Sequence, residues 1–248
     1  MSIGKGFQTA ILFLCETIDQ QMGSLPQYIR IIFILTTVLT VWLFYRLTNR
    51  SARFLVIAGV WLLFQSILSL SGFFTVIDTV PPRFILLLAP PLLFIAVIFL
   101  TPAGRRFIDS LNLKNLTLLH IVRVPVELIL YGLFLHHAVP GLLTFEGRNF
   151  DIIAGLSAPL VFYLGFAARS PRRILLLTWN ILCLALLLNI VAYAILSAPF
   201  SFQRLAFEQP NIAVFYFPFT LLPGCIVPLV LFSHLVAIRQ ILRNDRVD

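Results

Sequence analysis

Long apolar stretches, separated by short polar connections, run through most of the chain. A helix needs about 20 mostly apolar residues to cross roughly 30 Å of hydrocarbon. The stretches that approach this length are Tyr28–Leu47, Phe54–Val76, Phe84–Leu100, Leu116–Val139, Ile152–Ala168, Ile174–Ala198 and Ile212–Val236. They lack the apolar/polar alternation of a transmembrane β-barrel strand. The pattern therefore predicts an all-α polytopic membrane protein, a bundle of seven transmembrane helices.

The segments outside this pattern are short. Residues 1–27 are predicted to form an amphipathic N-terminal arm on the extracytoplasmic side, residues 28–242 the transmembrane domain, and residues 243–248 a short cytoplasmic tail. Hydrophobic residues make up 60% of the chain and charged residues 11%. A single water-soluble core cannot bury so much apolar sequence, which argues against a soluble enzyme and against a nucleic-acid-binding domain.

The basic residues gather in alternate connections, which predicts the orientation. Short cytoplasmic loops are enriched in Lys and Arg. Twelve of the 18 cations fall at the end of, or after, the first, third, fifth and seventh stretches: Arg46, Arg50, Arg53, Arg105, Arg106, Lys114, Arg169, Arg172, Arg173, Arg239, Arg243 and Arg246. We therefore expect the N-terminus outside, the C-terminus inside, and the plasma membrane as the location, which is the inner membrane in a cell that has two.

The fourth stretch carries the most polar chemistry. Because a helix turns 100° per residue, His120, Arg123, Glu127 and Tyr131 fall within an arc of about 80°. An unpaired charge near the middle of a membrane is costly, and ionisable residues there mark substrate or proton sites or buried ion pairs. Arg123, one helical turn before Glu127, is the expected partner, with Pro125 between them distorting the helix. A functional site and a structural ion pair both remain open.

The leading hypothesis is a gradient-driven transporter or a small-ligand-binding bundle, with a site around the fourth and seventh helices. In it Glu127 is the titratable group and Arg123 its counter-ion, and His120 and Tyr131 complete the polar stripe. The seventh stretch contains Pro218, Pro223 and Pro228, so we expect its helix to be kinked or locally unwound. Broken helices of this kind line substrate cavities in transporters.

Two alternatives belong to other functional classes. One is a membrane-embedded enzyme with an outer-face site in which histidines and acids act as acid–base or metal-binding groups; its candidate residues are His136, His137, Glu146, Arg148 and Asp151. The other is an accessory or assembly subunit without a site of its own, because interhelical hydrogen bonding accounts for every polar residue named. The sequence does not decide whether the protein is an enzyme.

No cofactor and no metal site are predicted. The histidine spacing matches no zinc signature. His120 and His234, on the fourth and seventh stretches, form the one pair that could serve as axial ligands of a haem. The expected partners are membrane lipids and a small-molecule or ion substrate, with no nucleic acid; the sequence leaves the oligomeric state open.

Overall fold

The computed structural model describes residues 22–243 apart from 78, 80 and 168–170. Most of the predicted N-terminal arm and nearly all of the predicted tail lie outside the described residues. Within them the regular structure is helical, which confirms the all-α class. The α-helices are α2 (Gln27–Leu47), α3 (Ala52–Leu70), α4 (Ile85–Leu100), α5 (Pro102–Asp109), α6 (Leu113–Leu119), α7 (Arg123–Leu135), α8 (Asp151–Phe166), α9 (Arg173–Leu196) and α10 (Val227–Leu242). Short 3₁₀ or π turns connect them: η1 (Phe73–Thr75), η2 (His120–Val122), η3 (Gly141–Leu143), η4 (Ala213–Phe215) and η5 (Leu222–Ile226).

Several of these helices are suited to a membrane. Five helical segments in the described part of the chain are long and apolar enough to cross one, and a sixth is added if α4 and α5, bent by 91°, count as one span. The remaining apolar helix, α8, has only 16 residues. Many apolar side chains face outward, as on α3, where Val60 and Leu63 are exposed. A helical bundle compatible with membrane insertion accounts for both features.

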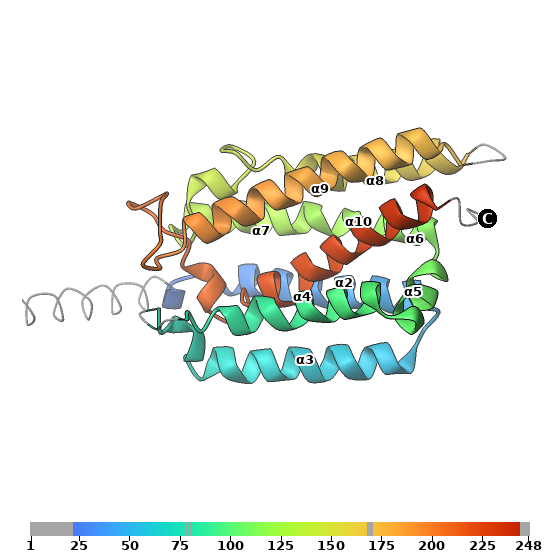
Figure 1. Ribbon diagram of the computed structural model, residues 1–248. Coiled ribbons are helices and arrows are strands. Elements are labelled where there is room, and N and C mark those ends of the chain that lie inside the picture. Colours follow the sequence, from blue (N-terminus) through green and yellow to red (C-terminus); the bar gives the residue numbers. More distant parts are fainter. Residues whose placement is uncertain (1–21, 78, 80, 168–170, 244–248) are drawn as a thin grey trace, which may run out of the picture.

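The helices form two groups with α10 running obliquely between them (Figure 1). Helices α7, α8 and α9 lie on one side of α10, whereas α2, α3 and α4 lie on the other. α10 packs against α9, α6 and α4, and α2 packs against α7. The interior of the bundle is therefore built largely on α10 and the α6–α7 segment, which are also its most buried spans.

Helix α5 closes the end of the bundle at which α10 ends (Figure 1). Asp109 accepts hydrogen bonds from Arg239 Nε and Nη2 at 2.8 and 3.1 Å, and Arg243 approaches it at 3.3 Å. Gln240 Nε2 donates to the carbonyls of Ile108 and Leu111 at 2.7 and 2.8 Å. The hydrogen bond from Arg239 holds the pKa of Asp109 below its usual value. These contacts fasten the sharp α4–α5 bend to the end of α10.

The seventh predicted span begins with an irregular turn before α10, as its prolines predict. Residues 222–226 form a π turn, η5, before α10 continues. The carbonyl of Gly224 accepts hydrogen bonds from Trp61 Nε1 at 2.8 Å and Gln65 Nε2 at 3.3 Å. Gln65 and Ser69 are the two buried residues of α3. Helix α3 is thus joined to the bundle by polar contacts with this irregular turn.

Candidate functional site

The fourth predicted span is a broken helix that points its polar stripe into the bundle. α6 and α7 are joined by the 3₁₀ turn η2, which begins at His120 and ends just before Arg123. Pro125 lacks an N–H for the hydrogen bond that would continue a regular helix through this point. His120, Arg123 and Glu127 are 0%, 3% and 1% exposed, as the helical spacing indicates.

Tyr131, the fourth residue of the stripe, lies apart from the other three. It is half-buried, packs against Phe145 with ring centroids 4.8 Å apart and ring planes tilted by 33°, and its phenol faces the exposed Glu146. The structure therefore places Tyr131 with the connection between α7 and α8.

That connection turns back into the bundle before α8 begins. Asp151, the first residue of α8, lies beside Arg123, the first residue of α7. α7 rises about 18 Å from Arg123 to its last residue. The connection must therefore run back along α7 over a similar distance to bring Asp151 beside Arg123. Thr144 and Asn149 are completely buried on this return path. At Gly155 the two helices approach closely: a Cβ there would lie 2.9 Å from the backbone nitrogen of Val124.

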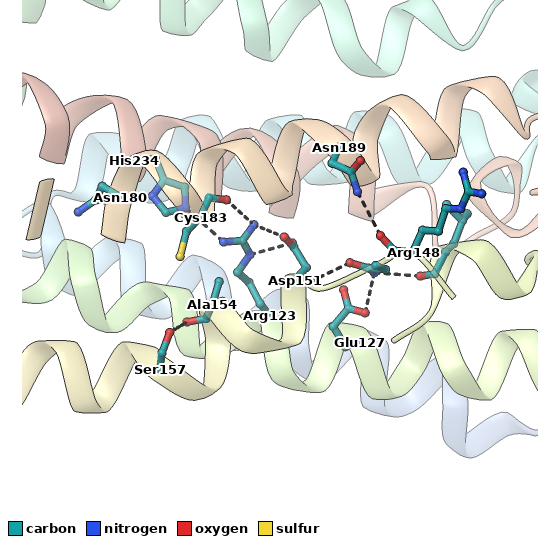
Figure 2. A network of polar contacts seen from close by, with 12 residues as sticks. Arg123, Glu127, Arg148, Asp151, Ala154, Ser157, Asn180, Cys183, Asn189 and His234 are labelled. Carbon is teal, nitrogen blue, oxygen red and sulfur yellow. Dashed lines mark hydrogen bonds and ion pairs between the residues drawn. The ribbon is translucent and has the colours of Figure 1, made fainter. Parts of the chain in front are cut away.

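Arg123 is held by Asp151, and the predicted pairing with Glu127 was wrong. Arg123 Nε donates to Asp151 Oδ2 at 2.8 Å, and Nη2 donates to Oδ1 at 2.6 Å (Figure 2). Arg123 also reaches the carbonyl of Cys183 at 3.3 Å and His234 Nε2 at 3.2 Å. A bidentate pair of this kind neutralises the guanidinium and fixes its plane. Arg123 is thus not the counter-ion of Glu127.

Glu127 instead contacts a neutral amide. Asn149 Nδ2 donates to Glu127 Oε2 at 2.6 Å and to the carbonyl of Leu143 at 2.9 Å. Asn149 Oδ1 accepts from the backbone N–H of Asp151 at 3.0 Å. Asn149 therefore links Glu127 to the Arg123–Asp151 pair. No ion pair to Glu127 occurs among the described residues.

The two buried histidines complete the site on its other side. Because a guanidinium only donates, His234 Nε2 accepts from Arg123, which puts the imidazole proton on Nδ1, facing Asn180 Oδ1 at 2.9 Å. His120 stacks on His234 with ring centroids 3.9 Å apart and an interplanar angle of 19°. Rings stacked this closely leave no space for a haem between them, so the axial-ligand hypothesis fails on geometry.

The residues of the predicted outer-face site do not converge. Asp151 is 5% exposed and belongs to the buried ion pair, whereas Glu146 is exposed. His137 Nδ1 lies 3.2 Å from Gln209 Oε1, and Arg148 donates to Tyr193 Oη at 3.2 Å. His136 is half-buried beside His137. Over the described ranges, no group of three His, Cys, Asp or Glu side chains could hold a metal ion.

Sequence reasoning missed the partners that the connection and α9 supply. Asp151 was assigned to the outer-face site, and neither Asn149 nor Asn180 was among the candidate site residues. One signal was available: the apolar stretch after Asp151 is, together with Phe84–Leu100, one of the two shortest, so the helix that Asp151 begins can start below the surface of the bundle.

Together, the fold and these contacts define a helical bundle compatible with membrane insertion, with a buried polar network between α7, α8, α9 and α10. The chain belongs to the family described as "Domain of unknown function (DUF8737)", whose model matches residues 81–242. The matched range contains every residue of the network and omits α2 and α3. Comparisons with curated proteins and with solved structures gave no match.

Proposed function

We propose that the protein is a gradient-driven transporter of a small solute, in which Glu127 takes up and releases a proton or a small cation. The observation that supports this most directly is the environment of Glu127. Its carboxyl is 1% exposed, accepts a hydrogen bond from neutral Asn149, and lies next to an Arg123 that Asp151 already neutralises. An uncompensated carboxylate in such an interior is costly, so binding a positive charge there is favourable.

The proposal includes the topology expected from the charges. Seven spans would cross the plasma membrane with the N-terminus outside and the C-terminus inside, and α8 with its preceding connection would together fill the fifth. In support, the end of α2, the start of α3, helix α5 and the start of α9 lie toward the same end of the bundle (Figure 1), and these segments carry Arg46, Arg53, Arg105 and Arg173. The partners would be membrane lipids and the transported solute.

The direct test is a charge-transfer measurement on reconstituted protein. Proteoliposomes on a solid-supported membrane receive concentration steps of a panel of small uncharged and anionic solutes under an imposed pH gradient. We expect at least one solute to give a transient current, because solute movement is coupled to the charge on Glu127. Glu127→Gln should reduce that current to the level of empty liposomes, while Glu127→Asp should retain part of it.

The matched control is Glu146→Gln, which makes the same chemical change on an exposed side chain of the same region. It should leave the current and the folded yield unchanged. A Glu127→Gln protein with normal folded yield and undiminished current would contradict the proposal. If instead Glu146→Gln alone removed the activity, the outer-face alternative would gain support.

An accessory or assembly subunit is the second candidate. The feature that favours it is Arg123, because four of the five N–H groups of its guanidinium already donate, to Asp151, His234 and the Cys183 carbonyl. For such a protein, neither the wild type nor any variant would give a solute-dependent current, and substitutions in the network would lower only the folded yield.

A further inference from the structure

A side pocket of about 60 Å³ lies between α4, α9 and the irregular turn η5, outside the Glu127 network. This volume is several times the roughly 10–15 Å³ that one water needs by the same kind of measure. The lining residues are Phe84, Leu88, Val191, Ala194, Ile195, Asn211, Val214, Leu222, Pro223 and Val227. Asn211 is thus the one polar residue in an otherwise apolar wall.

The floor of the pocket contains an unused hydrogen-bond acceptor. Asn211 is 1% exposed, and its Oδ1 is buried without a hydrogen-bond partner in the part of the chain that the structure describes. The rest of the residue is anchored: Nδ2 donates to the Ala194 carbonyl at 3.2 Å, and the backbone N–H donates to the Ser197 carbonyl at 2.9 Å. A buried acceptor without a donor costs about 1–3 kcal/mol. Asn211 lines the pocket, and no donor among the described residues uses this acceptor.

The rim shows where such a molecule would enter. Phe84, Asn211, Val214 and Pro223 are buried and form the floor, whereas the other six lining residues are half-exposed side chains of α4, α9, η5 and α10. The pocket therefore opens sideways, between helices whose outward faces are apolar. In a membrane this opening faces lipid.

We propose that this pocket binds an uncharged amphiphile dissolved in the membrane, whose terminal O–H or N–H donates to Asn211 Oδ1. The apolar wall accommodates the alkyl part, and the absence of charged side chains from the lining disfavours an ion. The bound molecule would contact Leu222 and Pro223 of the π turn, a type of irregularity that is frequent at functional sites. This site goes beyond the proposed transport function and does not depend on it.

The test uses photolabelling of the full chain in lipid nanodiscs with an octanol that carries a diazirine. Peptide mass spectrometry then locates the label. We expect enrichment on the α4 and α9 peptides that contain Leu88 and Val191, with protection by excess octan-1-ol and much weaker protection by octyl methyl ether. The ether has the same apolar chain but no donor. Label spread evenly over the exposed faces of α2 and α3, or equal protection by alcohol and ether, would overturn the proposal.

A pair of substitutions on α9 supplies an independent check. Val191→Trp should fill the pocket and remove the protected labelling, because Val191 lines it. Leu188→Trp introduces the same side chain at an exposed position of the same helix and should leave the labelling intact. Should Val191→Trp fail to fold, the contrast between alcohol and ether on the wild-type protein still decides the question.

Discussion

Arg123→Met is expected to abolish most of the folded yield of the protein. The substitution leaves Asp151 buried without its bidentate partner and removes the donors that reach His234 and the Cys183 carbonyl. Removing one partner of a buried ion pair costs about 3–5 kcal/mol, because the remaining charge is uncompensated. Size-exclusion chromatography of detergent extracts and thermal melts measure the loss.

The double variant Arg123→Met/Asp151→Leu separates this effect from a general intolerance of the site. It removes both charges, so a large part of the lost yield should return. Arg148→Met is the matched control, since it makes the same change at an exposed arginine of the neighbouring connection. Equal losses in the single and the double variants would show that the charge balance of the pair is not what stabilises the fold.

Gly147→Ala is expected to have the second largest effect on folding. An added Cβ would lie 2.3 Å from the carbonyl oxygen of Gly141 and 2.6 Å from the Cα of Leu142. Both are backbone atoms, so the connection itself must move to make room. Asn149, two residues after Gly147, donates to Glu127, and Asp151, four residues after it, pairs with Arg123. One methyl group should therefore lower both the folded yield and the melting temperature clearly.

Gly59→Ala provides the comparison for this prediction. It adds the same methyl group on α3, where no other part of the described structure, beyond the adjoining residues and backbone of the helix itself, lies within 4 Å of the new Cβ. Its melting temperature should stay the same or rise slightly, because alanine is the better helix former. If the melting temperatures of Gly147→Ala and Gly59→Ala were equal, the backbone around Gly147 would be less tightly packed than its contacts indicate.

The helical stretches could be predicted from hydrophobic length alone, because apolar runs must be buried or face lipid wherever they occur. The break before α10 could also be predicted, since Pro223 and Pro228 cannot donate backbone hydrogen bonds. The turn of 100° per residue predicted that His120, Arg123 and Glu127 share one face of their helix. These properties depend on residues close together in the sequence.

The partners of those residues could not be predicted in this way. Arg123 and Glu127 are four residues apart, and local spacing favoured that pair over Asp151, which is 28 residues from Arg123. The choice depends on where α8 begins, and that depth is set by the folded connection and by the close contact at Gly155. The helical period predicts which residues share one face of a helix. It does not predict the depth in the bundle at which a neighbouring helix begins.

The central claim is that Glu127, left without a cation by the Arg123–Asp151 pair, exchanges a positive charge. Infrared difference spectroscopy of the protein in lipid, recorded while the pH is changed, tests it most directly. We predict a carbonyl band of a protonated carboxylic acid that appears reversibly as the pH falls, shifts in heavy water, and is missing from Glu127→Gln. Wild-type and Glu127→Gln spectra without any difference in this band across the accessible pH range would contradict the claim.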